Sequence, residues 1–198
     1  YPNPWGSGIT MPVGNVERLI TNMRLMHRAG VTGVFTDHCG FHARGGWSEL
    51  QSYLLYKLMQ DVNCDTDRII AEFTDNFYGP AAPLMRTYLH ELEQGRKAMI
   101  DLPRGVTYRS AEYDERTFPY LTVDNIHRWQ TAFDRMEELA AGQPERVLVN
   151  LRLVRRELDF ATLWKWFDLK KAYPEYFRDY TVHADRITAV NQVKAPPP

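Results

Sequence analysis

The 198-residue sequence predicts a mainly α-helical protein, and three observations support this class. Helical spacing of apolar residues covers roughly two thirds of the chain, against about one third in an average soluble domain. A single short run has the length and composition of a β-strand. The second half holds three successive apolar seams joined by short turns with Gly or Pro, which is the pattern of an antiparallel helical bundle.

The first expected elements are a helix over residues 15–29 and a strand over residues 31–35. Gly30 stands between them, where a left-handed C-terminal helix cap belongs. The run VTGVF is rich in β-branched residues and too short for a helix, so we predict a buried strand. Residues 36–46 are polar, contain glycines and lack periodicity, which predicts a loop. The apolar positions of the helix are Val16, Leu19, Ile20, Met23 and Met26.

Three further helices are expected before the middle of the chain. Ser48 and Gln51 form a capping-box pair ahead of a second helix that runs to about Gln60. Asp65 caps a third helix, and residues 78–80 (YGP) end it and begin a fourth. We expect these last two helices to pack at their junction through Phe73, Phe77, Leu84 and Tyr88.

The stretch 102–121 is the longest irregular connection, and we expect the chain to divide there. Beyond it, three helices are predicted, and the second of them closes before Tyr173. Their apolar seams are Ile126, Trp129, Phe133, Met136 and Ala140; Val147, Leu151, Val154, Leu158 and Ala161; and Tyr176, Tyr180, His183, Ile187 and Val190. His183 therefore lies on a seam, where we expect a hydrogen-bonded core histidine.

Composition excludes several classes of partner. With 24 Lys+Arg against 25 Asp+Glu the net charge is -1, which argues against a nucleic-acid surface. No dense Lys/Arg cluster suggests an anionic membrane surface, and no run of about eighteen apolar residues could span a bilayer. Cys39 and Cys64 do not make a disulfide framework. We expect a soluble protein with no nucleic-acid partner, no membrane partner and no cofactor.

Reactive residues crowd together in one place, residues 37–42 (DHCGFH), directly after the predicted strand. In parallel α/β architectures the loop leaving the carboxyl end of a strand carries the functional groups, so Asp37 and His38 would face a cleft. Three alternatives stay open. The loop is a solvated turn capped by Asp37, or it is a zinc site, or Cys39 is a nucleophile.

Two tryptophans stand in loops rather than on apolar stripes. Trp5 lies in the opening YPNPWGSG, and Trp47 follows two glycines. A flat aromatic ring in a loop has the shape to stack on the apolar face of a sugar, although each ring could equally fill the edge of the core.

Three segments, taken in order, resemble a bacterial family of α-glucuronidase-like TIM-barrel glycoside hydrolases. They are residues 29–35 (AGVTGVF), 49–59 (ELQSYLLYKLM) and 73–82 (FTDNFYGPAA), and the resemblance covers roughly residues 12–93. It implies that GVTGVF is the eighth barrel strand, that the Leu-rich helix closes the barrel, and that the helix pair after it begins a helical C-terminal region.

The resemblance also implies where the chemistry lies. The first six barrel strands, and with them the catalytic acids, would precede Tyr1, so the chain would be a piece of a longer protein and inactive alone. Asp37 would bind sugar hydroxyls, whereas the His38-Cys39 pair departs from the family pattern. Membership would place the protein in polysaccharide degradation, in the periplasm or outside the cell.

We therefore expect the end of a (β/α)8 barrel over residues 1–62, a helical pair over 63–101, an irregular connection over 102–121 and an antiparallel bundle over 122–195. The expected function is that of the C-terminal portion of a glycoside hydrolase-like protein, with carbohydrate as partner. Its expected substrate-binding residues are Asp37, His38, Trp5 and Trp47, with no metal.

The alternative is a stand-alone α-helical protein-interaction module without enzymatic activity. The edge of the predicted strand separates the two hypotheses. A lone strand leaves backbone N–H and C=O groups unpaired, at about 1–3 kcal/mol for each group that stays buried, so it needs the missing barrel half or a second subunit to cover it.

Overall fold

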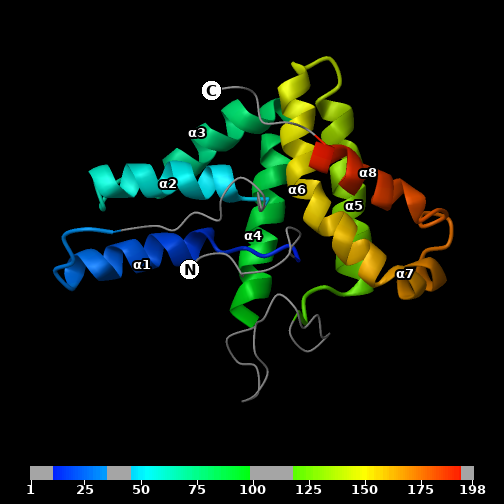
Figure 1. The fold of residues 1–198 in the computed structure, drawn as a ribbon, viewed down its shortest axis with the longest axis horizontal. Helices are drawn as coiled ribbons and strands as arrows, with labels where there is room; N and C mark the ends of the chain where they lie inside the picture. Colours follow the sequence, from blue (N-terminus) through cyan, green and yellow to red (C-terminus); the bar gives the residue numbers. More distant parts are fainter. Residues whose placement is uncertain (1–10, 35–45, 99–117, 193–198) are drawn as a thin grey trace.

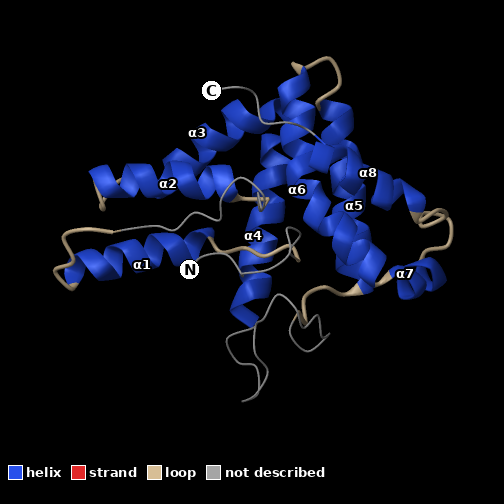
Figure 2. Cartoon of the chain, in the orientation of Figure 1, coloured by secondary structure: helices blue, strands red, loops and turns tan. Residues whose placement is uncertain are grey.

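A computed structural model of the chain describes residues 11–34, 46–98 and 118–192 (Figure 1). Within these ranges every regular element is a helix, so the prediction of a mainly α-helical protein is confirmed (Figure 2). None of the described helices is both long and apolar enough to cross a lipid bilayer.

The elements, in chain order, are α1 (Val16–Arg28), α2 (Ser48–Gln60), α3 (Thr66–Tyr78), the short 3₁₀ helix η1 (Gly79–Ala81), α4 (Ala82–Ala98), α5 (Val123–Leu139), α6 (Glu145–Trp164), α7 (Trp166–Ala172) and α8 (Thr181–Gln192). Helices α4, α5 and α6 form the centre of the molecule, with α3 packed against α4 and α6 (Figure 1). The pair α1 and α2 extends to one side of this centre, and α7 and α8 lie on the other. The centre therefore separates two peripheral helix pairs.

Two predicted helix ends are confirmed. Gly30 has φ +80°, and its N–H donates to His27 O at 3.0 Å, so it closes α1 in the left-handed conformation that glycine favours. Asp65 caps α3, because its Oδ1 accepts from the backbone N–H of Arg68 at 3.0 Å.

The predicted capping box at the start of α2 is wrong. Trp47 occupies the N-cap position, and its side chain makes no capping hydrogen bond. Gln51 is buried and its amide donates to Asn15 Oδ1 instead. The cause is tertiary: Gln51 faces the start of α1, so its side chain bonds across two helices rather than along its own.

The buried strand predicted for residues 31–35 is not formed over residues 31–34, and Phe35 lies outside the described residues. Val31 is 44 % exposed, and Val34 is half-buried against the core. A strand forms only where a neighbour accepts and donates its backbone hydrogen bonds. The described part of the chain offers no second extended segment at this place, so the segment stays irregular.

In the second half the first two predicted seams are confirmed. All ten positions are buried: Ile126, Trp129, Phe133 and Met136 on α5 with Ala140 at its C-cap, and Val147, Leu151, Val154, Leu158 and Ala161 on α6. The long second helix, however, breaks at Lys165 and continues as the separate α7. The third seam begins late, because Asp179 caps Thr181 and leaves Tyr176 and Tyr180 ahead of α8.

The junction of α3 and α4 differs from the prediction in one respect. Tyr78 is buried there, whereas Phe73 and Phe77 are half-buried and stack on each other with ring centroids 4.7 Å apart. The chain reverses at Gly79, whose φ of +55° and ψ of -130° suit glycine, so Tyr78 points inward and Phe77 towards the rim.

A single hydrophobic core includes residues from both halves of the chain. The ring of Tyr88 on α4 lies 5.0 Å from that of Phe133 and 5.5 Å from that of Trp129, both on α5. Phe118, at the end of the predicted connection, is also buried. Residues 102–117 lie outside the described residues, and the division of the chain at 102–121 stays a prediction.

Candidate functional site

Most of the predicted site residues fall outside the described part of the chain. This holds for Trp5, for Asp37 and His38, and for all of residues 37–42, so neither the zinc nor the nucleophile alternative is placed. Among the described residues no three His, Cys, Asp or Glu side chains are grouped so that they could hold a metal ion.

Trp47 is the one predicted site residue that the structure places. It is 3 % exposed, and its ring centroid lies 6.1 Å from that of Tyr88. Its indole Nε1 and the Tyr88 hydroxyl are both buried without a hydrogen-bond partner. Trp47 therefore sits as a core residue beneath the start of α2, and stacking on a sugar would require its exposure.

Two buried carboxylates from the centre of the molecule hold the starts of α1 and α2. Glu93 on α4 accepts through Oε1 from Val16 N at 2.5 Å and from Glu17 N at 3.1 Å. Glu157 on α6 accepts through Oε1 from Gly46 N at 2.9 Å. Because helix starts carry unpaired N–H groups and partial positive charge, acidic side chains are well placed there.

The first of these contacts is packed closely. A Cβ on Gly14 would lie 2.4 Å from the backbone nitrogen of Glu93, so the chain entering α1 touches the backbone of α4. Nearby, the Tyr120 hydroxyl donates to Pro12 O at 2.8 Å. Burial raises the pKa of Glu93, and the two backbone donors and Arg96 offset only part of that effect.

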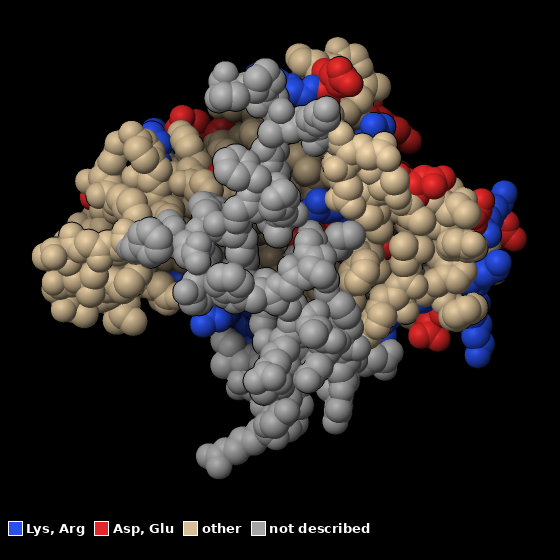
Figure 3. All heavy atoms as spheres, viewed as in Figure 1, with Lys and Arg blue, Asp and Glu red and all other residues tan. Residues whose placement is uncertain are grey.

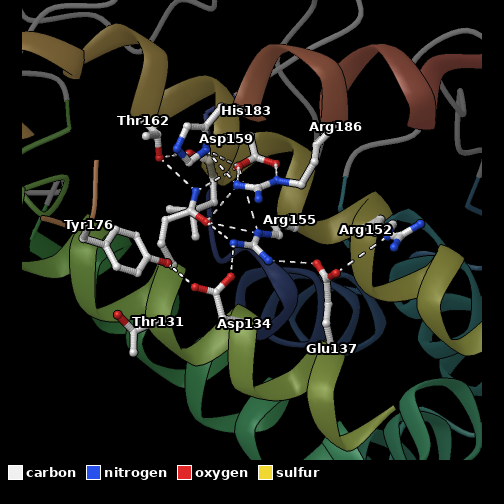
Figure 4. Close-up of polar contacts among 12 residues, drawn as sticks. Thr131, Asp134, Glu137, Arg152, Arg155, Asp159, Thr162, Tyr176, His183 and Arg186 are labelled. Atoms are coloured by element: carbon white, nitrogen blue, oxygen red, sulfur yellow. Dashed lines mark hydrogen bonds and ion pairs between the residues drawn. The ribbon is translucent and has the colours of Figure 1, made fainter. Parts of the chain in front are cut away.

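The largest polar group of the interior joins α5, α6 and α8, and we call it the Asp159 cluster (Figure 4). Its members are Gln130, Asp134, Glu137, Arg155, Asp159, Thr162, Tyr176, His183 and Arg186. Two arginines stand here against three carboxylates, and all of these charges lie within one hydrogen-bonded group.

Asp159 is the centre of the cluster, and its side chain is 1 % exposed. Its Oδ1 accepts from Gln130 Nε2 at 2.9 Å and from Arg186 Nη2 at 2.7 Å, and its Oδ2 accepts from Arg186 Nε at 3.0 Å. Burial raises the pKa of Asp159, but hydrogen bonds from His183 and Arg186 and the charges of Arg186 and Arg155 outweigh burial, so the pKa lies below its ordinary value.

His183 is a hydrogen-bonded core histidine, as its place on the seam predicts. Its Nδ1 lies 2.7 Å from Asp159 Oδ1 and 2.8 Å from Arg186 Nη2. An ionised carboxylate only accepts hydrogen bonds, so Nδ1 carries the hydrogen and donates it to Asp159. The close approach of Arg186 Nη2 to Nδ1 is then a packing contact rather than a hydrogen bond.

Arg155 ties α6 to α5. Its side chain is 3 % exposed, and it donates to Gln130 Oε1, to Asp134 Oδ1 at 2.6 Å and to Glu137 Oε1 at 2.8 Å. Burial lowers the pKa of Arg155. The charges of Asp159 and Asp134 raise this pKa by more than burial lowers it, so it lies above its ordinary value. The guanidinium therefore stays charged inside the bundle.

Comparison with known proteins finds one protein family whose model matches part of the chain. Residues 7–90 match a family described as a domain of unknown function, DUF4838. The match covers less than half of the 198 residues and ends within α4. No curated protein matches the chain, and no solved structure does. The whole Asp159 cluster lies outside the DUF4838 match.

The chemistry of the Asp159 cluster is that of a structural clamp. Its two arginines are paired with its three carboxylates, and among the described residues no exposed nucleophile is part of it. Sequence reasoning found His183 but missed Arg155 and Asp159, which stand four residues apart on α6 beside the apolar seam. That spacing also describes an exposed ion pair, so the sequence carried only a weak signal of burial.

The lowered pKa of Asp159 predicts a loss of stability in acid. A carboxyl whose pKa is lower in the folded than in the unfolded chain stabilises the fold above its unfolded pKa of about 4, and this contribution disappears as the pH falls through the folded pKa. We expect wild-type stability in urea to fall below about pH 4. Asp159→Asn should lose stability near neutral pH and show a shallower acid decline, and an unchanged decline would contradict this assignment.

Proposed function

We propose that this chain is the C-terminal portion of a glycoside hydrolase-like carbohydrate-active protein. In this proposal α1, residues 31–34 and α2 are the last helix–strand–helix unit of a (β/α)8 barrel, and the remaining helices form a C-terminal region. The observation that carries the proposal is the parallel course of α1 and α2, with residues 31–34 turning back after α1.

Contacts at both ends establish that α1 and α2 run in the same direction. At their starts, Gln51 of α2 bonds to Asn15, which precedes α1. At the other end, Arg24 of α1 donates to Val62 O at 3.3 Å and to Cys64 O at 3.2 Å, just after α2. In a (β/α)8 barrel consecutive helices lie parallel, and the strand between them runs the opposite way.

Residues 31–34 have the direction that such a unit needs. After the reversal at Gly30 they leave the far end of α1 and turn back in the direction of the start of α2 (Figure 1). Residues 31–33 are exposed. Upstream strands of a barrel would cover this segment and supply its backbone partners.

The family match and the glycosidase resemblance cover nearly the same part of the chain. The DUF4838 match over residues 7–90 spans α1, α2 and α3, and it contains all three segments on which the glycosidase resemblance rests. Asp37 and His38 follow the returning segment in sequence, at what would be the carboxyl end of the last strand. We assign them, with Trp5, to sugar binding, and we place the catalytic carboxylates upstream of Tyr1.

One observation favours the second candidate, a protein-interaction module. Leu25 on α1 and Tyr56 and Met59 on α2 are each at least half exposed, at 54 %, 59 % and 50 %. On the face seen in Figure 3, the surface at α1 and α2 also shows few charges, whereas charges of both signs crowd the side of α7 and α8. Exposed apolar residues of this kind are typical of surfaces that contact another chain.

Kinetics on the complete protein test the carbohydrate proposal. We expect Asp37→Ala to lower kcat/KM on its glycoside by about ten- to a hundred-fold, the worth of one charged hydrogen bond of about 1.5–3 kcal/mol. His38→Ala serves as the neighbouring variant, and melting temperatures control for folding. Unchanged kinetics in both variants would remove these residues from the site, and a loss beyond about ten-thousand-fold would make Asp37 a catalytic group.

The coding sequence upstream of Tyr1 separates the two candidates directly. Alternating strands and helices there would support the barrel. A start codon immediately before Tyr1 would support the interaction module.

A further inference from the structure

We propose that α8 is a detachable helix, which opens as a unit from α6 while the rest of the fold stays intact, and that the buried carboxylate of Asp159 is the group that holds it closed. The proposal does not depend on the carbohydrate function. It rests on the distribution of apolar and ionic contacts along α8.

The apolar contribution of α8 to the fold is small. Three of its residues are buried, His183, Ile187 and Val190. Ile187 and Val190 stand apart from the main hydrophobic core, which includes residues of every other α-helix. A helix attached in this way opens at a lower free energy than the elements that form the core.

Polar contacts to α6 are a second part of the attachment of α8. His183 and Arg186 both bind the Asp159 carboxylate, and Asn191 Oδ1 accepts from Arg156 Nη1 at 3.0 Å near the end of α8. Arg156 and Asp159 both belong to α6, so α8 is fastened along one neighbour at two points, of which Figure 4 shows the one at Asp159.

The chain before α8 contains a natural hinge. Phe177 is buried against Trp166 and anchors the preceding turn in the core. Residues 178–180 are exposed and lie in no helix, and Asp179 caps the first turn of α8. Rotation at residues 178–180 would move α8 away and would part His183 from the rings of Phe177 and Trp166, while Phe177 stays packed on Trp166.

The charges around Asp159 make the opening local. If Asp159 lost its charge, Arg155 would keep Asp134 and Glu137 of α5 as partners, so the contact of α5 with α6 would survive. Arg186 has no second carboxylate partner among the described residues, and its remaining acceptor is Gln130 Oε1 at 3.5 Å. Neutral Asp159 therefore weakens α8 selectively.

Opening would uncover Arg156 and Asp159 of α6, the two residues that bond to α8. These side chains are buried in the closed state. Helix α8 thus acts as a removable cover on the centre of the molecule.

Hydrogen–deuterium exchange at neutral pH tests this inference on the full chain. In the wild type we expect amides of residues 181–192 to exchange at least about ten-fold faster than the slowest amides of α5 and α6, and in Asp159→Asn the amides of 181–192 should exchange at least about ten-fold faster still. Asp185→Asn is the matched control, because it removes a carboxylate from the exposed side of α8, and it should leave exchange as in the wild type.

Arg186→Gln is the second variant, and it decides the matter if Asp159→Asn does not fold. It removes the same ion pair from the α8 side, where the side chain is 22 % exposed, and the same acceleration of residues 181–192 is expected. Exchange of residues 181–192 no faster than that of α5 and α6 in the wild type would show that α8 opens only with the whole fold. Unchanged exchange in α8 would show that Asp159 does not hold it.

Discussion

Replacing Arg155 by methionine should lower the free energy of unfolding by about 3–5 kcal/mol, as expected when one partner is removed from a buried ion group. The guanidinium is 3 % exposed and pairs with Asp134 and Glu137. It also lies 4.0 Å from the buried carboxylate of Asp159. Methionine fills much of the volume but leaves these carboxylates without their central cation.

Arg152→Met is the matched control, since Arg152 stands one turn earlier on α6 and is 47 % exposed. Its Nε lies 3.8 Å from Glu137, the geometry of a surface ion pair. We expect a change below about 1 kcal/mol for this variant. Denaturant unfolding of both variants at neutral pH provides the measurement.

A double variant distinguishes the loss of attraction between Arg155 and Asp159 from the cost of leaving one of these buried charges unpaired. Asp159→Asn added to Arg155→Met should cost less than the sum of the two single changes, because each change relieves the charge that the other leaves unpaired. Additive costs would mean that the two side chains act independently, and a loss under about 1 kcal/mol for Arg155→Met would mean that water reaches the cluster.

The buried apolar side chains of α5 and α6 could be predicted well from the sequence. The seams of α5 and α6 follow from residue spacing alone, because a helix buries the face on which apolar side chains recur every three or four residues. Gly30 and Asp65 likewise act within their own turn of chain, so their roles are visible locally.

The buried polar side chains depend on neighbouring helices, which the spacing of residues along the sequence does not reveal. Arg155 and Asp159 are buried because α5 and α8 pack over them, and Gln51 turns to Asn15 because α1 lies beside it. Residues 31–34 have the composition of a strand, but composition does not supply the strand that must pair with them. The predicted site residues Trp5, Asp37 and His38 lie outside the described residues, so sugar binding stays a prediction.

Phe133→Ala should also cost about 3–5 kcal/mol, as expected for removing a large side chain from a well-packed core. Phe133 is fully buried on α5, where it contacts Tyr88 of α4 and lies under the guanidinium of Arg155 at 5.8 Å. Phe167→Ala is the control, because that ring is 87 % exposed, and its cost should stay within about 0.5 kcal/mol.

The form of the Phe133→Ala transition decides how the chain is divided. Because Phe133 joins α4 to α5, a core shared between the halves predicts one cooperative transition, with probes in α3 and α6 shifting together. A separate bundle over residues 122–195 predicts two transitions, of which the variant shifts mainly the one that contains α6. Proteolysis between residues 102 and 121, followed by circular dichroism of the released fragment, gives an independent reading. A helical fragment would confirm the predicted boundary, whereas a coil would show that α5 and α6 need Tyr88 and its neighbours on α4 to fold.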